Sequence, residues 1–116
     1  MAWLMSEARV LASVDVATTR AEKAKGLLGR DTMEGAYAIP KCRWVHTIGM
    51  RFPVDVAYLD ADNVVIKIAS MHRYRMALPV PKARTVLEAK AGAFERWHLR
   101  VGDPVEIRMT DPHEVT

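Results

Sequence analysis

The strongest constraint on the fold is a pair of β-forming runs separated by a short turn. Val54 to Leu59 and Val64 to Ala69 are rich in β-branched and aromatic residues, and Asp60 to Asn63 lie between them. Aspartate and asparagine favour turns because their short side chains bond the nearby backbone and tolerate left-handed φ angles. Two β-rich runs joined in this way predict an antiparallel hairpin.

Further strands are predicted on both sides of this hairpin. In Val10 to Val16, valines and alanine at one parity alternate with Ser13 and Asp15 at the other, which is the pattern of a strand with one buried face. The other predicted strands are Ala36 to Ile39, Arg43 to Ile48, Thr85 to Ala89 and, after a turn at 101–104, Val105 to Met109. Pro40 separates the first two of these and favours a break or an edge position.

One helix is predicted near the N-terminus. Thr19 precedes Glu22 by three residues, the spacing at which the two side chains cap free amides in the first turn of a helix, and Gly29 can end the helix. The helix should run from about Arg20 to Leu28. Many short strands with one short N-terminal helix predict a mainly β fold, either a compact antiparallel sandwich or a partly open barrel.

Length and composition limit the broad class of protein. A chain of 116 residues, half of them hydrophobic, fits one globular domain over 1–116 with a fraying tail at 111–116. The single cysteine, Cys42, cannot form an internal disulfide, which favours a reducing, cytoplasmic location. We expect neither a signal peptide nor a membrane span, because no stretch approaches the ~20 apolar residues of a spanning helix.

The charge balance bears on partners. Seventeen basic and 14 acidic residues give a formal net charge of +3, which favours anions without requiring a nucleic acid. We expect no nucleic-acid partner and no cofactor, and either a monomer or a weak homodimer.

Three side chains could form a soft-metal site. Cys42, His46 and Met50 follow one another at intervals of four residues, so they share a face in a helix or in an unbroken strand. Sulfur and imidazole ligands suit Cu(I), or Zn(II) with a fourth ligand. The competing interpretation, which we prefer, is that the two sulfur side chains are core residues, since no close-spaced ligand pair accompanies them. A thiol enzyme that pairs Cys42 with His46, oriented by Asp55, is a further alternative.

A basic connection follows the hairpin. The segment 71–84 contains Arg73, Arg75 and Tyr74, a combination that can hold a phosphate or carboxylate and stack a flat ring. The simpler interpretation is a solvated loop. Asp55, at the start of a strand, should point away from Val54 and Val56 and could accept hydrogen bonds from loop amides or lie unpartnered at the surface.

Five pieces of the chain together resemble the bacterial and archaeal family called domain of unknown function 192. They are GLLGR at 26–30, GAYAI at 35–39, VHTIGMRFPVDVAYLD at 45–60, TVLEAKAG at 85–92 and VGD at 101–103. The resemblance spans about 10–109 and implies a compact β-rich fold with no assigned activity. The positions that match the family's motifs are Gly26, Leu27, Arg30, His46, Thr47, Met50, Pro53, Asp55, Glu88, Gly92, Gly102 and Asp103.

The motif residues are not equally informative about function. The glycines and Pro53 have backbone explanations, because turns need a positive or a fixed φ. His46, Thr47, Asp55 and Arg30 have none, so they rank first as ligand-binding residues, with Arg73 and Arg75 added from the basic connection. Glu88 and Asp103 are expected to be structural.

The sequence therefore predicts a small β-rich binding module that recognises a small anionic ligand or a protein partner. Two alternatives stay open. One is a soft-metal site or thiol enzyme that uses Cys42, His46 and Met50, and the other is an interaction subunit of an envelope or secretion assembly.

Overall fold

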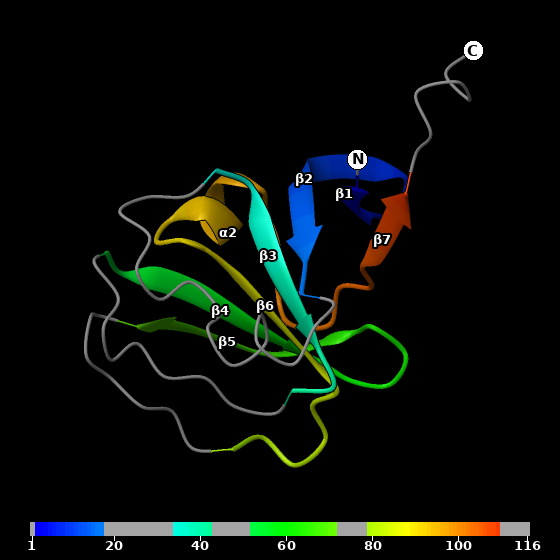
Figure 1. Ribbon diagram of the computed structural model, residues 1–116, viewed down its shortest axis with the longest axis vertical. Helices are drawn as coiled ribbons and strands as arrows, with labels where there is room; N and C mark the ends of the chain where they lie inside the picture. The colour runs from blue at the N-terminus through cyan, green and yellow to red at the C-terminus, as the bar shows by residue number, and fades with distance from the viewer. Residues whose placement is uncertain (1, 18–33, 43–51, 72–78, 110–116) are drawn as a thin grey trace.

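The computed structural model describes residues 2–17, 34–42, 52–71 and 79–109, and it folds them around one curved sheet of seven strands (Figure 1). The strands are β1 (Ala2–Ser6), β2 (Arg9–Val16), β3 (Ala36–Pro40), β4 (Val54–Leu59), β5 (Val65–Met71), β6 (Thr85–Lys90) and β7 (Glu106–Met109). One short helix, α2 (Ala93–Arg96), connects β6 to β7. The fold is mainly β, as the sequence predicts.

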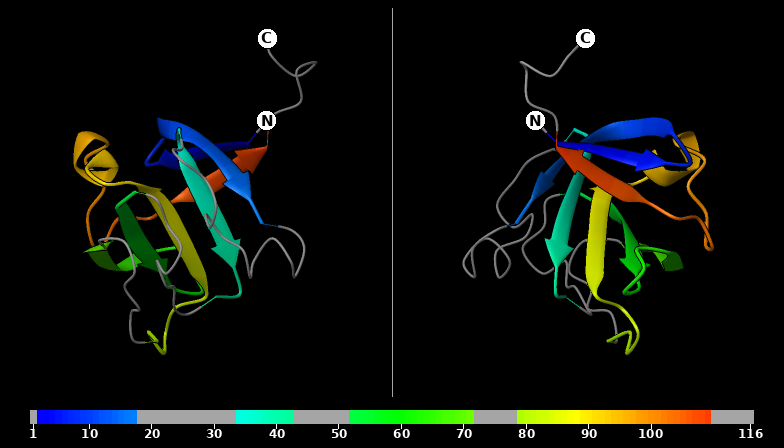
Figure 2. Two further views of the ribbon diagram at one scale, coloured as in Figure 1. Left: turned by 60° about the vertical axis from the view of Figure 1, so that its left-hand side comes forward. Right: turned by 90° about the vertical axis from the view of Figure 1, so that its right-hand side faces the viewer.

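The sheet order is β5-β4-β6-β3-β2-β1-β7, and of these neighbours only β2 and β3 run parallel. The sheet coils until its two ends approach each other (Figure 2). Val64 forms an isolated antiparallel bridge with Pro104, and the Val65 amide donates to the Asp103 carbonyl at 2.9 Å. The sheet is not continuously closed by strand pairing, so the partly open barrel is the better of the two predicted descriptions.

The predicted hairpin is confirmed as β4 and β5, and its turn owes its shape to Asp60. The Asp60 carboxylate accepts hydrogen bonds from the amides of Asp62 at 2.9 Å and Val64 at 3.0 Å. Asn63 adopts the left-handed conformation, with a φ of 59°. These are the two properties of short polar side chains on which the prediction rested.

Strands β2, β3, β6 and β7 also lie where the sequence predicts them, but β1 and α2 were not predicted. In β1, outward-facing Trp3 and Met5 alternate with inward-facing Ala2 and Leu4, so the strand lacks the polar parity that reveals a half-buried strand. The helix α2 has only four residues and starts after Gly92, which has a φ of 91°. The predicted helix at 20–28 and strand at 43–48 lie outside the described residues.

Side-chain alternation divides the interior into two cores. The first core contains Ala2, Leu4, Val14, Ala36, Ala38, Ala57, Leu59, Val65, Leu87, Ala89, Ala93, Phe94, Leu99 and Val105. The second core contains Ala17, Tyr37, Ile39, Phe52, Val54, Val56, Tyr58, Met71, Ala83 and Val86. Because successive side chains of a strand point to opposite faces, β3, β4 and β6 contribute to both cores.

Candidate functional site

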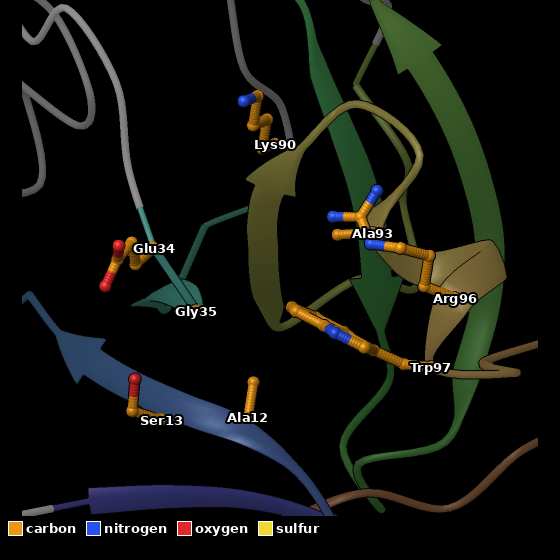
Figure 3. A pocket seen from close by; sticks show the side chains of 8 residues that line it. All are labelled: Ala12, Ser13, Glu34, Gly35, Lys90, Ala93, Arg96 and Trp97. Atoms are coloured by element: carbon orange, nitrogen blue, oxygen red, sulfur yellow. The ribbon is translucent and has the colours of Figure 1, made fainter.

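A cavity of about 430 Å³ opens where the adjacent strands β2, β3 and β6 meet α2 (Figure 3). We call it the α2 cavity. Its lining residues are Ala12, Ser13, Glu34, Gly35, Lys90, Ala93, Arg96 and Trp97. They come from three parts of the chain that are far apart in sequence, and they include three charged side chains and one indole.

Two cationic residues line this cavity, one at the end of β6 and one in α2. Lys90 is the last residue of β6 and Arg96 is the last residue of α2, and both are exposed. The Arg96 side chain folds back toward Ala93 (Figure 3). Gly92 permits this close approach, because a Cβ atom built at Gly92 would lie 3.2 Å from a terminal nitrogen of the guanidinium.

An indole ring forms one wall of the cavity. Trp97 directly follows α2, and its ring packs against Phe94 of the first core at a centroid separation of 5.7 Å and an angle of 51°. Its carbonyl accepts a hydrogen bond from Arg9 of β2 at 2.8 Å. The tryptophan backbone and ring are thus held from two sides, and the wall it forms is fixed in place.

Gly35 lies where β3 approaches β2. It has a φ of 69°, and a Cβ atom there would collide with the carbonyl oxygen and the hydroxyl of Ser13. Only glycine fits such a position. The absence of a side chain at Gly35 also keeps that part of the α2 cavity open.

The charges around the α2 cavity do not cancel. Lys90 and Arg96 supply two positive charges and Glu34 one negative charge. In the part of the chain that the structure describes, none of the three forms a salt bridge. Figure 3 shows Glu34 across the cavity from Arg96 and Trp97. A net positive charge next to an apolar wall favours an organic or inorganic anion.

Asp55 is buried, with 4% of its surface exposed, and it organises the start of α2. Its carboxylate accepts hydrogen bonds from the Ser70 hydroxyl at 2.8 Å, the Gly92 amide at 2.9 Å and the Phe94 amide at 3.3 Å. The expectation that Asp55 accepts bonds from loop amides is confirmed, and the alternative of an unpartnered surface position is wrong. Asp55 also lines a second cavity, of about 560 Å³, with His98 among the other lining residues.

The opposite face of the sheet holds a buried acid. Glu88 lies on β6 directly across from Tyr37 of β3, and burial raises the pKa of its carboxyl to about 7. Tyr58, diagonally across on β4, has a buried hydroxyl with no hydrogen-bond partner among the described residues. Burial raises the pKa of Tyr58, and the nearby Cys42 and Glu88 raise it further. Three titratable groups therefore lie close together at the second core.

Described residues that flank the segments carrying most of the sequence-predicted site residues belong to this second core. Ala17 precedes 18–33, Cys42 and Phe52 flank 43–51, and Met71 precedes 72–78, and all four pack in or against the second core. Arg30, His46, Thr47, Met50, Arg73 and Arg75 themselves lie outside the described residues. Of the predicted set, the structure therefore places Asp55 and Cys42, which lie on opposite faces of the sheet.

Sequence reasoning missed Lys90, Arg96 and Trp97 as members of one site. Lys90 carries a signal only in retrospect, as the charged residue that ends a buried strand two residues before Gly92. The burial of Glu88 had a clearer signal, because Val86 to Ala89 is a short run in which only Glu88 is polar, as in strands covered on both faces. Nothing local indicates that α2 brings Trp97 beside β2.

Two further features of the described residues concern metal ions and membranes. The described segments contain no group of three or more histidine, cysteine, aspartate or glutamate side chains arranged to hold a metal ion. The predicted set Cys42, His46 and Met50 is not tested by this result, since only Cys42 is described. In the same segments, no helix is both long and apolar enough to cross a membrane.

Comparisons with known structures support the fold. The structure is similar to a crystal structure of a protein of unknown function from Novosphingobium aromaticivorans DSM 12444, with a TM-score of 0.76 and 25% identity, covering 90% of this chain and 82% of that one. It is also similar to a putative transcription regulator from Sinorhizobium meliloti 1021, with a TM-score of 0.73 and 20% identity over 91% of each chain. The second likeness concerns the fold alone.

Sequence comparisons identify the family. Two curated proteins named UPF0127, from Pyrococcus abyssi and Pyrococcus furiosus, are each 29% identical over 62 residues. That match covers 53% of this chain and 53% of each relative, so it spans about half the length of the curated relatives. The family model DUF192, described as an uncharacterized ACR, matches residues 3–107. This match extends into β1 and covers most of the chain. The chain therefore belongs to the domain of unknown function 192 family.

Proposed function

We propose that this chain is a small β-rich binding module that recognises a small anionic ligand in the α2 cavity. The observation that carries the proposal is that Lys90 and Arg96 line one cavity together with Trp97. A volume of about 430 Å³ is within the range of small-molecule sites. The alternative ligand of this module is a protein partner. An interaction subunit of an envelope or secretion assembly also stays a prediction.

The chemistry of the lining side chains supports an anion. A guanidinium can bind a carboxylate or phosphate through two parallel hydrogen bonds, and an ammonium adds a point charge. Ser13 adds a hydroxyl from β2. Because Lys90 and Arg96 are exposed, water and salt screen their attraction, and we expect binding that weakens as ionic strength rises.

Asp55 contributes to this site as a positioning residue. Its bonds to the amides of Gly92 and Phe94 hold the turn from which α2 starts, and α2 carries Arg96. Arg30, His46, Thr47, Arg73 and Arg75 remain proposed ligand-binding residues.

The proposal predicts a sign-specific response to substitution. Lys90→Ala combined with Arg96→Ala should weaken binding of inorganic phosphate about tenfold at low salt, because two screened charge contacts are lost. Glu34→Gln should strengthen it, since it removes a repulsive charge from the opposite wall. Isothermal titration calorimetry measures both effects.

The matched control is Arg108→Ala, which removes an exposed arginine of β7 that pairs with Glu106 at 3.2 Å, away from the α2 cavity. This variant should bind phosphate like the wild type. Equal phosphate affinity in the wild type and the Lys90/Arg96 double variant would refute the proposal.

A thiol enzyme is a further candidate, and the grouping of Cys42, Tyr58 and Glu88 favours it. A carboxyl group with a pKa of about 7 can exchange protons at neutral pH, as a general base must. On this alternative, iodoacetamide should label Cys42 rapidly at neutral pH, and Glu88→Gln should slow the labelling. A slow rate in both proteins, measured by mass spectrometry, would dismiss the candidate.

A further inference from the structure

We propose that the ligand of the α2 cavity is an aromatic monocarboxylate, whose ring packs on Trp97 and whose carboxylate meets Arg96. This inference rests on the proposed function, because it concerns the same cavity, and it adds the chemical class of the ligand.

The indole is the reason to expect a flat apolar body. Trp97 forms a wall of the α2 cavity, and its contacts with Phe94 and Arg9 hold it in place. A ring that is already fixed loses little side-chain entropy when a ligand packs on it. Offset or tilted packing of a second aromatic ring adds to the area that is buried.

Small neighbouring side chains keep that wall accessible. Ala12 and Ala93 line the same cavity and contribute only methyl groups, and Gly35 contributes none. In Figure 3 the Trp97 ring extends into the space between Ala12 and the Arg96 side chain. A ligand ring packed on the face of the indole nearer Arg96 would have apolar carbon on one side and the guanidinium on the other.

Glu34 favours a single negative charge over two. Its carboxylate lies across the α2 cavity from Arg96, so it repels any anion that enters. That repulsion is about twice as large for a doubly charged phosphate as for a carboxylate. A monoanion can also turn its charged end toward Arg96 and leave its uncharged end facing Glu34.

The test compares benzoate with acetate and with benzamide, the uncharged analogue of benzoate. For the wild type, we expect benzoate to bind about tenfold more tightly than acetate, through the ring, and benzamide to bind more weakly than benzoate, through the lost charge. Trp97→Leu should reduce benzoate affinity to the level of acetate.

Because Trp97→Leu removes a packing partner of Phe94, a second measurement uses the wild type alone. Nuclear Overhauser effects between the benzoate ring protons and the Trp97 indole protons should appear on binding. Benzoate affinity equal to that of acetate, or no such effects, would overturn the assignment of an aromatic ligand and leave the anion site standing. Benzamide binding as tight as benzoate would instead refute the role of the charge, and with it the proposed function.

Discussion

Replacing Asp55 by alanine should lower the free energy of unfolding by about 4 kcal/mol, because it removes the acceptor of three hydrogen bonds in a largely buried position. The Phe94 amide is the costliest donor to leave unpaired, since Phe94 is 2% exposed and water cannot easily replace the carboxylate. Urea unfolding followed by far-UV circular dichroism measures the loss.

Ser70→Ala is the matched control for this prediction. It removes one of the same three bonds, the one at 2.8 Å, but Ser70 is exposed and water can satisfy the carboxylate in its place. We expect a loss of about 1 kcal/mol or less. Equal losses in Asp55→Ala and Ser70→Ala would show that the bonds to the start of α2 contribute nothing, and would contradict the positioning role of Asp55.

The second large effect is a pH dependence of stability that arises from Glu88. Its carboxyl has a pKa of about 7 in the folded protein against 4.5 as the ordinary value, with burial as the cause. Between these two values the unfolded chain has released this proton and the folded chain still holds it. The contribution of Glu88 to the free energy of unfolding is therefore highest below pH 4.5, falls as the pH rises, and levels off above pH 7.

From pH 5 to pH 8 the free energy of unfolding of the wild type should fall by about 2 to 3 kcal/mol relative to that of Glu88→Gln, which keeps the shape of the neutral carboxyl and does not titrate. The measurement is the difference in free energy of unfolding between the two proteins at each pH, so that all other titrating groups cancel. Parallel pH profiles for the two proteins would mean that Glu88 titrates normally in the folded state.

The strands that sequence analysis predicts are those in which local chemistry and tertiary structure agree. The turn after Leu59 arises from contacts within a few residues, so it can be read locally. The alternation in Val10 to Val16 correctly locates β2 and its buried Val14, although Val10 itself is exposed. In β1 the outward-facing Trp3 and Met5 are apolar, and the pattern that marks a half-buried strand is lost. The polarity of Asp55 indicates a hydrogen-bonding role, but only the fold reveals that its partners are Gly92 and Phe94.

The α2 cavity could not be predicted, because it is made by packing. Ser13 and Gly35 come together through the parallel pairing of β2 with β3, and α2 begins far along the chain from both, at Ala93. A helix of four residues carries no periodic signal, and it is this helix that brings Arg96 and Trp97 to the cavity. Sequence analysis therefore favours an anion as the ligand from charge alone but cannot locate the cavity.

The proposal that the α2 cavity binds a small anion is tested most directly by phosphate titration of ¹⁵N-labelled protein, followed by amide chemical shifts. We predict that the shifts concentrate at Gly35, Ala93 and Trp97, including the indole N–H, and diminish in the Lys90/Arg96 double variant. Phosphate-induced shifts that are absent from these residues, or that concentrate instead around Met5 and Val10 at the other end of β2, would contradict it.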